Sequence, residues 1–386
     1  MKVLHVISGL DPENGGPTFA LMGMAAAQAA AGLKVSVLAT WQIQSGFPLA
    51  QQLRDKGVAV DLIGQATGKL SRHPDLAGAV DRSVGEAGVV HIHALWEEIQ
   101  HQTARAAQRR DVPYVVTPHG MLSPWSRAQG TVVNRWGKKL YLAARLRANL
   151  DRAAMIHFTT GAERDLVAPL GLKAPALVET IGLDLEEFRD LPPRGAFRAQ
   201  HPEVANRPMV LLLSRLSPQK GLDRLIPAFA KLARPEAVLV LAGPDYDGYG
   251  EVVRRLVREN AIESRVLFAG MLQGRARIEA LVDGDLFVLP SHHENFGIVV
   301  AEAMAAGAAL VVSREVNLWN EVVASGAGAA VSGEVNELAA EMGRWLDDPA
   351  RRASAGRAGR AYALEHYDWN TIARHWVEHY GRLIQK

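Results

Sequence analysis

The fold is decided by residues 2–40, KVLHVISGLDPENGGPTFALMGMAAAQAAAGLKVSVLAT. Two short runs rich in β-branched residues, KVLHVIS and LKVSVLAT, flank an Ala-rich stretch that predicts a helix over 17–31. A strand, a helix and a second strand in this order are the unit of a parallel sheet with helices on both faces. We therefore expect an α/β protein whose first strand begins at residue 2.

The same alternation continues along the chain in two series. Further strands are predicted at 58–63, 89–94, 113–117, 155–160, 208–216, 237–243, 265–270, 285–291 and 309–313. Between the series, residues 190–208 cluster Pro, Arg and Gly and break the periodicity. We expect two Rossmann-like domains, 1–190 and 205–368, that face each other across a cleft lined by the loops at the carboxyl ends of the strands.

The composition of the 386-residue chain excludes several classes of protein. Hydrophobic residues make up 48% and charged residues 22%, as in ordinary soluble globular domains. With 43 Lys and Arg against 41 Asp and Glu, the net charge of +2 is too small for a protein that binds nucleic acid through its phosphates. No cysteine is present, which excludes disulfides, a catalytic thiol and iron–sulfur ligation. The N-terminal segment lacks the pattern of a signal peptide, so we expect a cytoplasmic protein, with contact to the inner face of the membrane left open.

Residues 291–307, SHHENFGIVVAEAMAAG, carry two glutamates in a turn and the helix after it. Glu302 stands among apolar neighbours, where a carboxylate is costly unless a ligand or a basic side chain donates hydrogen bonds to it. Eight residues of helix would separate Glu294 and Glu302 by about 12 Å along the axis, a spacing that suits two parts of one extended ligand. The alternative is a solvated Glu294 and a Glu302 paired with a basic residue.

A second group lies in residues 211–225, LLLSRLSPQKGLDRL, where Arg215 and Lys220 follow a predicted strand in a loop that opens a helix. The planar fork of Arg and the compact charge of Lys suit a diphosphate. Alone, the two cations could equally be exposed loop charges. Together with Glu294 and Glu302 they favour a site for a nucleotide-linked substrate.

These two groups resemble the donor site of the retaining glycosyltransferases of family four, which have the GT-B fold. The resemblance extends over nearly the whole chain, through Gly15 and Gly16, the T-P-H-G of 117–120, the G-x-D-x-x-x-F of 182–188 and the E-V-V-x-x-G of 321–326. The chain departs from the family at Asn295, where E-G-F-G is usual, at Ala309, where Pro is usual, and at Ile181, where Asn is usual.

The resemblance implies a role for each site residue. Glu294 would lie beside the transferred sugar, Glu302 would bind the ribose, and Arg215 and Lys220 would hold the diphosphate as it leaves. The remaining donor-binding residues are expected to be Gly15, Gly16, Gly270, Met271, Asn295, Phe296 and Gly297. The family also implies that a C-terminal helix within 369–386 packs back onto the first domain.

Glycines and histidines of the first domain are further candidates. Gly15 and Gly16 lie at the start of the predicted helix, where backbone N–H groups can face a phosphate or a hydroxyl, although a merely flexible loop is the alternative. No G-x-G-x-x-G follows the first strand, which disfavours an oxidoreductase. His119 follows a strand and is expected to be catalytic through a hydrogen bond to the sugar, or else a packing residue. His91 and His93 share one face of a strand but show no third metal ligand, and His93 is expected at the cleft.

The expected enzyme needs no metal and no cofactor. Two D-x-D sequences, at 245–247 and 283–285, match the metal-binding pattern of the other major glycosyltransferase fold, but the first reads as an ordinary loop. Arg215 and Lys220 would already neutralise the leaving diphosphate, which is the task of such a metal.

Residues 125–152 contain seven basic residues against one acid, Asp151, with Trp and Tyr between them. Such a segment can lie on an anionic membrane or bind an acidic acceptor, and a solvated helix face is the alternative.

We thus expect a retaining enzyme that moves a sugar from a nucleotide diphosphate sugar to a glycan, a lipid-linked or a small-molecule acceptor, as in the synthesis of polysaccharide, lipopolysaccharide or another glycoconjugate. No second carboxylate stands out as a covalent nucleophile, so a same-face displacement is preferred. The rivals are an epimerase or phosphorylase of the same fold and a non-catalytic nucleotide-sugar binding protein. The base, sugar and acceptor stay open.

Overall fold

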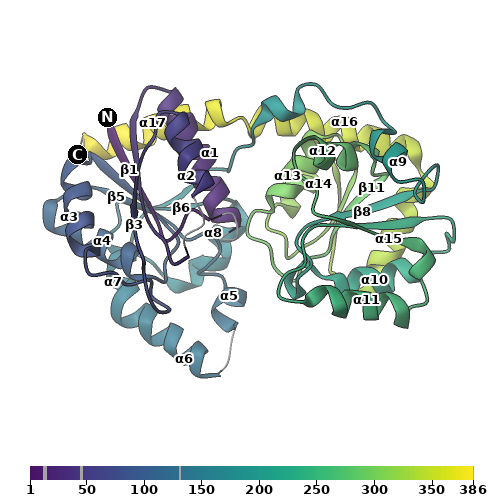
Figure 1. The fold of residues 1–386 in the computed structure, drawn as a ribbon, viewed down its shortest axis with the longest axis horizontal. Coiled ribbons are helices and arrows are strands. Elements are labelled where there is room, and N and C mark those ends of the chain that lie inside the picture. The colour runs from purple at the N-terminus through teal and green to yellow at the C-terminus, as the bar shows by residue number, and fades with distance from the viewer. Residues whose placement is uncertain (12–14, 44–46, 130–131, 386) are drawn as a thin grey trace. The chain divides into compact units, whose positions relative to one another are not determined.

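The computed structural model describes residues 1–11, 15–43, 47–129 and 132–385, without the side chains of 132–135 and 139. The chain forms two compact units (Figure 1). The first unit consists of Met1–Gly182 and Trp369–Lys386, and the second of Leu183–Asp368. The chain therefore leaves the first unit and returns to it near its end.

The first unit is built on a sheet of seven parallel strands in the order β3-β2-β1-β4-β5-β6-β7. The central strands are buried along their whole length, as expected for a parallel sheet covered on both faces. The strands are β1 (Lys2–Ile7), β2 (Lys34–Thr40), β3 (Ala59–Ile63), β4 (Val89–His93), β5 (Tyr114–Thr117), β6 (Met155–Phe158) and β7 (Ala176–Val178).

Helices cover the two faces of this sheet. On one face α1 packs against α17, and Trp376 and Tyr380 of α17 join the core of β1, β4 and β5. The helices are α1 (Gly16–Ala30), α2 (Pro48–Asp55), α3 (Leu76–Glu86), α4 (Glu98–Arg110), α5 (Pro124–Ala128), α6 (Val132–Tyr141), α7 (Arg147–Asp151), α8 (Gly161–Val167) and α17 (Trp369–Ile384), with a π-helical turn at Leu142–Leu146. In Figure 1 the last helix, in yellow, runs beside the purple α1.

The second unit has a sheet of six parallel strands in the order β10-β9-β8-β11-β12-β13. Its central strands β8, β9 and β11 consist almost wholly of buried Val, Leu and Phe. The strands are β8 (Met209–Leu213), β9 (Val238–Ala242), β10 (Val266–Gly270), β11 (Leu286–Leu289), β12 (Leu310–Ser313) and β13 (Gly328–Val331).

Eight α-helices of the described residues belong to the second unit. They are α9 (Ala196–Gln200), α10 (Leu222–Ala230), α11 (Tyr249–Glu259), α12 (Gly274–Asp283), α13 (Ile298–Ala305), α14 (Trp319–Ala324), α15 (Val335–Asp347) and α16 (Pro349–His366). The predicted pair of doubly wound α/β domains is confirmed. β7, β13, α15 and α16 were not among the predicted elements.

The boundary between the two units lies after Gly182, before the linker expected at 190–208. Phe188 is held on the second unit by Arg360, which donates to its carbonyl (2.8 Å). Further along, the Asp283 side chain accepts hydrogen bonds from the backbone N–H groups of Gly195 (2.5 Å) and Arg198 (3.0 Å). These bonds hold α9, at the centre of the expected linker, on the second unit.

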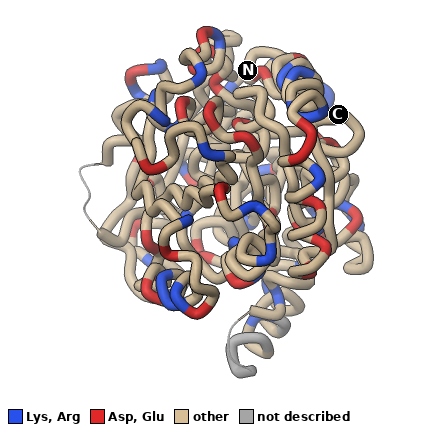
Figure 2. Tube along the Cα trace, turned by 90° about the vertical axis from the view of Figure 1, so that its right-hand side faces the viewer, with Lys and Arg blue, Asp and Glu red and all other residues tan. Residues whose placement is uncertain are grey.

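Positive and negative residues are interspersed along the chain (Figure 2). Among the residues described, no helix has both the length and the apolar character that crossing a bilayer requires.

Candidate active site

The candidate donor residues of the second unit lie at the point where its strand order reverses. β8 is flanked by β9 on one side and by β11 on the other, so the loops after β8 and β11 diverge at their carboxyl ends. Ligands of open parallel sheets bind at such points. The loop after β8 carries Arg215 and Lys220, and the loop after β11 carries Glu294.

These two loops are fastened to each other through their backbones. Gln219 accepts a hydrogen bond from the N–H of His292 (2.8 Å) and donates its side-chain amide to the carbonyl of His293 (2.7 Å). Gly221 has a φ of 71°, and a Cβ atom at this position would lie 1.9 Å from the carbonyl oxygen of Pro290. Only glycine fits both the left-handed backbone and the close approach.

Lys220 and Glu294 form an ion pair between the two loops. The Lys220 side chain is 10% exposed and that of Glu294 16% exposed. The backbone of Glu294 is also fixed, because its N–H donates to Glu315 (2.9 Å) and its carbonyl accepts from Asn317 (3.0 Å). A cation and a carboxylate are thus held at one place beside the sheet edge.

Arg215 is half-buried, and its guanidinium lies over the ring of Tyr246, 4.9 Å from the centroid. Within the described residues it forms no ion pair with an acid. Its charge is therefore available to an anion at the carboxyl end of β8.

Glu302 lies on α13 and is buried. Its Oε1 accepts from Arg277 (2.8 Å), which also pairs with Glu187, so the predicted alternative of a basic partner is present. Within the part of the chain that the structure describes, Oε2 of Glu302 accepts no hydrogen bond. Burial raises the pKa of Glu302 above its usual value, against the opposing charge of Arg277.

The remaining predicted donor residues occupy two places. Asn295, Phe296 and Gly297 form the turn before α13, where Phe296 is buried against Tyr367 and Gly297 has a φ of 76°. Gly270 is the last residue of β10, two strands from β8, and Met271, which follows it, is 60% exposed.

Three of the four acids of the two D-x-D sequences have partners within the second unit. Asp245 accepts from the N–H of Gly250 (2.8 Å). Asp283 holds α9 as described above, and Asp285 pairs with Arg198 (2.8 Å) and accepts from the N–H of Met209 (2.8 Å). These three carboxylates anchor loops and strands.

In the first unit, Gly15 and Gly16 begin α1 as predicted. Gly15 has a φ of 71°, and its carbonyl accepts from the N–H of Thr18 (3.1 Å). A Cβ atom at Gly16 would meet nothing within 4 Å, so its surroundings are open among the described residues. The preceding residues 12–14 lie outside the described residues.

His119 lies just after β5 with a φ of 49° and is half-buried. The turn is held by Glu163, which accepts from the N–H of Gly120 (2.6 Å) and from the N–H of Thr159 (2.8 Å). Burial, with a smaller contribution from His157, lowers the pKa of His119 to about 3, so its imidazole is neutral at pH 7. Sequence reasoning missed Glu163, although the T-x-x-E of 160–163 is the pattern of a helix cap.

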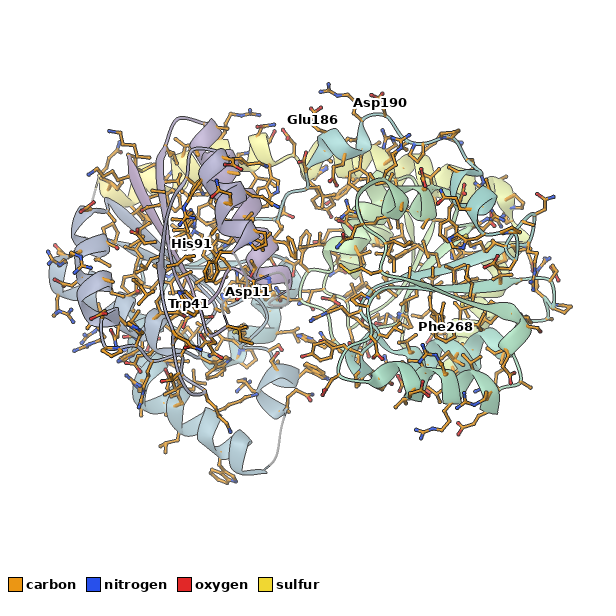
Figure 3. All side chains as sticks on the ribbon, viewed as in Figure 1. Asp11, Trp41, His91, Glu186, Asp190 and Phe268 are labelled. Carbon is orange, nitrogen blue, oxygen red and sulfur yellow. The ribbon has the colours of Figure 1, made fainter. Side chains whose placement is uncertain are left out.

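His93 is fully buried rather than exposed at a site, because β4 is central in the sheet. The third histidine that the sequence did not reveal is His5 of β1, which pairs in register with His91 of β4. One nitrogen from each of His5, His91 and His93 lies within 4.8 Å of the others. Figure 3 shows His91 in the interior of the first unit.

Comparison with known proteins identifies the family. The family model described as glycosyl transferases group 1 matches residues 193–362, and that of the glycosyl transferase 4-like domain matches residues 15–181. The D-inositol 3-phosphate glycosyltransferase of Kineococcus radiotolerans is 31% identical over 308 residues, which cover 72% of this chain and 68% of that protein. The chain belongs to the group 1 glycosyltransferases.

Two further similarities extend over the whole glycosyltransferase. The GDP-mannose:cellobiosyl-diphosphopolyprenol alpha-mannosyltransferase of Xanthomonas campestris is 26% identical over 396 residues, covering 100% of this chain and 97% of that protein. The structure of Anabaena HepE in complex with UDP and glucose superimposes with a TM-score of 0.80 at 23% identity, covering 99% of this chain and 100% of that one. The fold is therefore the GT-B fold, as the resemblance implied.

Several basic side chains of residues 125–152 are already paired or hydrogen-bonded within the first unit of the glycosyltransferase. Arg145 pairs with Glu98 (3.1 Å), Arg147 with Asp151 (2.7 Å), and Lys138 donates to the carbonyl of Ser126 (3.0 Å). The side chains of Arg135 and Lys139 lie outside the described residues. Among the described side chains of α6, Trp136 is 67% and Leu140 71% exposed.

Proposed function

We propose that this glycosyltransferase moves a sugar from a nucleotide diphosphate sugar to an acceptor hydroxyl with retention of the anomeric configuration and without a metal ion. The observation that carries the proposal is the ion pair of Lys220 and Glu294 between two fastened loops at the switch point of the second sheet, with Arg215 on the first of these loops.

Arg215 and Lys220 would neutralise the diphosphate. As the bond between the sugar carbon and the phosphate oxygen breaks, negative charge grows on the leaving diphosphate, and fixed cations stabilise it without rearrangement. Bound diphosphate would compete with Glu294 for Lys220, which leaves the carboxylate of Glu294 for the hydroxyls of the transferred sugar.

Glu302 is proposed to bind the ribose. Arg277 holds one of its oxygens and orients the carboxylate, while Oε2 is left to accept hydrogen bonds from two ribose hydroxyls. A buried carboxylate whose second oxygen lacks a donor gains most from such a ligand.

Retention is proposed through a same-face displacement. The acceptor oxygen forms its bond to the sugar carbon on the face from which the diphosphate leaves, and the proton of the acceptor hydroxyl passes to a phosphate oxygen. Glu294 is the carboxylate that the two fastened loops hold beside Lys220. Its proposed hydrogen bonds to the sugar hydroxyls leave the displacement itself to the acceptor oxygen.

Metal independence is supported by the hydrogen bonds that the carboxylates of Asp245, Asp283 and Asp285 already accept. These carboxylates would have to give up those bonds to coordinate an ion. The relatives' names suggest which substrates to try. The Xanthomonas relative uses GDP-mannose and a diphosphopolyprenol-linked acceptor, and HepE was solved with UDP and glucose, so UDP-glucose and GDP-mannose are the first donors to test.

The test is a donor panel of UDP-, GDP- and ADP-linked sugars, with release of nucleoside diphosphate measured with and without EDTA. We expect one nucleotide class to be hydrolysed or transferred at a rate that EDTA leaves unchanged, and a glycoside product whose one-bond C1–H1 coupling shows the same anomeric configuration as the donor. An inverted product, or loss of turnover in EDTA that Mg²⁺ restores, would refute the mechanism. Release of free sugar phosphate would indicate a phosphorylase, and an altered sugar on the nucleotide an epimerase.

We also propose that α6 touches an anionic membrane or a lipid-linked acceptor through Trp136 and Leu140. Large apolar side chains exposed beside basic residues are the features of an interfacial helix.

A further inference from the structure

A continuous chain of hydrogen bonds runs through the interior of the first unit and ends at His119. It begins at a backbone carbonyl, that of Glu179, which accepts from Nε2 of His157 (2.8 Å). A carbonyl can only accept, so Nε2 of His157 carries a proton. Burial lowers the pKa of His157 to about 4, so at pH 7 the ring is neutral and its Nδ1 is an acceptor.

Thr117 is the next residue in the chain, and it fixes which atom donates in the next hydrogen bond. Its hydroxyl lies 2.8 Å from Nδ1 of His157 and 2.6 Å from Nε2 of His91. The hydroxyl has one proton, which must go to His157, so the Thr117 oxygen accepts from a protonated Nε2 of His91. Burial holds the pKa of His91 well below its usual value, and the neutral ring therefore has an unprotonated Nδ1.

Tyr380 of α17 and Gln28 of α1 continue the chain from His91 on β4 to His5 on β1. Nδ1 of His91 accepts from the hydroxyl of Tyr380 (2.6 Å), whose oxygen accepts from the side-chain amide of Gln28 (3.4 Å). With its NH₂ group turned to Tyr380, Gln28 presents its oxygen to Nε2 of His5 (2.8 Å). Nε2 of His5 is therefore protonated.

The last two links are between imidazoles. Nδ1 of His5 accepts from Nε2 of His93 (3.0 Å), and Nδ1 of His93 accepts from Nε2 of His119 (3.1 Å). Burial lowers the pKa of His5 to about 4 and that of His93 well below its usual value, so these rings too carry one proton each. The chain ends with Nδ1 of His119, which forms no hydrogen bond within the residues that the structure describes.

The alternative use of these rings is a metal site at His5, His91 and His93. Each of the six ring nitrogens of these three residues already has a hydrogen-bond partner. His5 and His93 bond directly to each other, so an ion would have to break the chain. The hydrogen-bonded arrangement therefore explains every ring nitrogen without a further ligand.

We propose that this chain fixes His119 as the tautomer with a proton on Nε2, so that Nδ1 is a permanent acceptor for a substrate hydroxyl. Gln28 and Tyr380 are then positioning residues, because they act on the substrate only through the imidazoles. The role of His119 toward substrate rests on the proposed function, whereas its tautomer is a property of the ligand-free protein.

The direct test is histidine ¹⁵N NMR on the full-length, ligand-free protein at pH 7. The signals of His119 are assigned by their loss in His119→Gln. We expect Nε2 of His119 at the shift of a protonated nitrogen and Nδ1 at that of an unprotonated one, with the same tautomer at His5, His91, His93 and His157. A protonated Nδ1 at His119 would overturn the proposal.

Matched variants test whether a change at Tyr380 or Gln28 alters the tautomer of His119. Tyr380→Phe removes one oxygen and lies four hydrogen bonds from His119, through Gln28, His5 and His93. Without its hydroxyl the Gln28 amide can turn either way, so the His119 nitrogens should move toward the average of the two tautomers. Gln28→Met should do the same. Gln108→Met, a half-buried glutamine outside the chain that bonds to Tyr114, is the control and should change nothing. Unchanged His119 shifts in both folded variants would refute the coupling.

Two further measurements separate the possible failures. Zn²⁺ added to the protein should leave the signals unchanged, and stoichiometric binding that shifts His5, His91 and His93 would overturn the chain in favour of a metal site. If half of the molecules hold the wrong tautomer, apparent substrate affinity should fall about twofold in Tyr380→Phe. Should His119→Gln keep full activity while the tautomer is as expected, the chain stands and only the proposed role of His119 fails.

Discussion

The backbone of Gly221 runs so close to Pro290 that a methyl group on Gly221 would penetrate the Pro290 carbonyl, at 1.9 Å from its oxygen. This contact joins the loop that carries Lys220 to the loop that carries Glu294. The spacing of the two charged groups is therefore set by backbone packing.

Gly221→Ala should destabilise the protein by about 3 kcal/mol or more and reduce glycosyl transfer, because the backbone has to shift as well as bear a positive φ. Gly248→Ala is the matched control, since Gly248 has a φ of 73° in the same unit but open space around its Cβ position. It should cost about 1 kcal/mol. Urea denaturation measures both, and equal losses would show that the Pro290 contact is not decisive.

Lys220→Met and Glu294→Gln should each lower kcat by about 100-fold or more, as removal of a group that stabilises transition-state charge does. Melting temperature and circular dichroism check that the fold is kept. Lys231→Met is the control, because Lys231 bonds to Asn336 at the far end of α10. A Glu294→Gln enzyme that turns over at the wild-type rate would contradict the site assignment.

Arg215→Ala should lower kcat more than it raises KM, since the charge it neutralises grows as the diphosphate leaves. Arg254, which lies over Phe268 at 5.4 Å as Arg215 lies over Tyr246, supplies the control Arg254→Ala. The two variants lose the same type of ring contact, so a difference in kcat reports the position of the charge. If Arg215→Ala changes only KM, its role is confined to donor binding.

The free energy of unfolding should fall as the pH is lowered from about 6.5 toward 4. His5 and His157 have pKa values of about 4 in the folded protein, and those of His91 and His93 are also depressed, so the unfolded chain binds protons first. Each such histidine contributes a slope of up to about 1.4 kcal/mol per pH unit. His157→Gln keeps a donor and an acceptor. It should lower the slope of the unfolding free energy against pH, measured by urea denaturation, by close to the contribution of one proton. Its effect on the slope should vanish between pH 7 and 8, and an unchanged slope at pH 5 would contradict the burial argument.

The double variant Trp136→Ser, Leu140→Ser should weaken binding to anionic phosphatidylglycerol vesicles, because inserting each side chain is worth about 2 kcal/mol. Co-sedimentation at low salt measures the binding, and Ile43→Ser, which alters another exposed apolar residue, is the control. Failure of the wild-type protein to bind such vesicles would refute the membrane proposal. The proposal for nucleotide-sugar binding would not be affected.

That the loops carrying Arg215, Lys220 and Glu294 lie together could be predicted because parallel strands bring their carboxyl ends to one edge. Arg215, Lys220 and Glu294 are separated by up to 79 residues in sequence, yet each follows a strand that reads clearly as buried, and β8 and β11 are neighbours. No such rule identifies His5, because a single histidine in a first strand looks like any core residue. Its partner depends on the register of β1 with β4.

Other features were missed for different physical reasons. The buried face of α16 consists of Ala355, Gly356, Gly359 and Ala363, so close backbone packing replaces the large apolar side chains that make a helix visible in sequence. The ion pairs of the basic segment, residues 125–152, were missed for a related reason. Counting charges does not show that Arg145 meets Glu98, which lies 47 residues earlier.

The position of α17 has a consequence for biosynthesis. Trp376 and Tyr380 complete the core formed by β1, β4 and β5, and Tyr380 also closes the hydrogen-bond chain to His5. The first unit therefore contains segments that precede and follow the second unit along the chain. On the ribosome, Leu183–Asp368 can fold as soon as it emerges, with its two ends joined by the hydrogen bond from Leu183 to Tyr367 (2.7 Å). The N-terminal sheet must wait for the last helix, and a nascent chain truncated before Trp369 would expose its unfinished apolar face to chaperones.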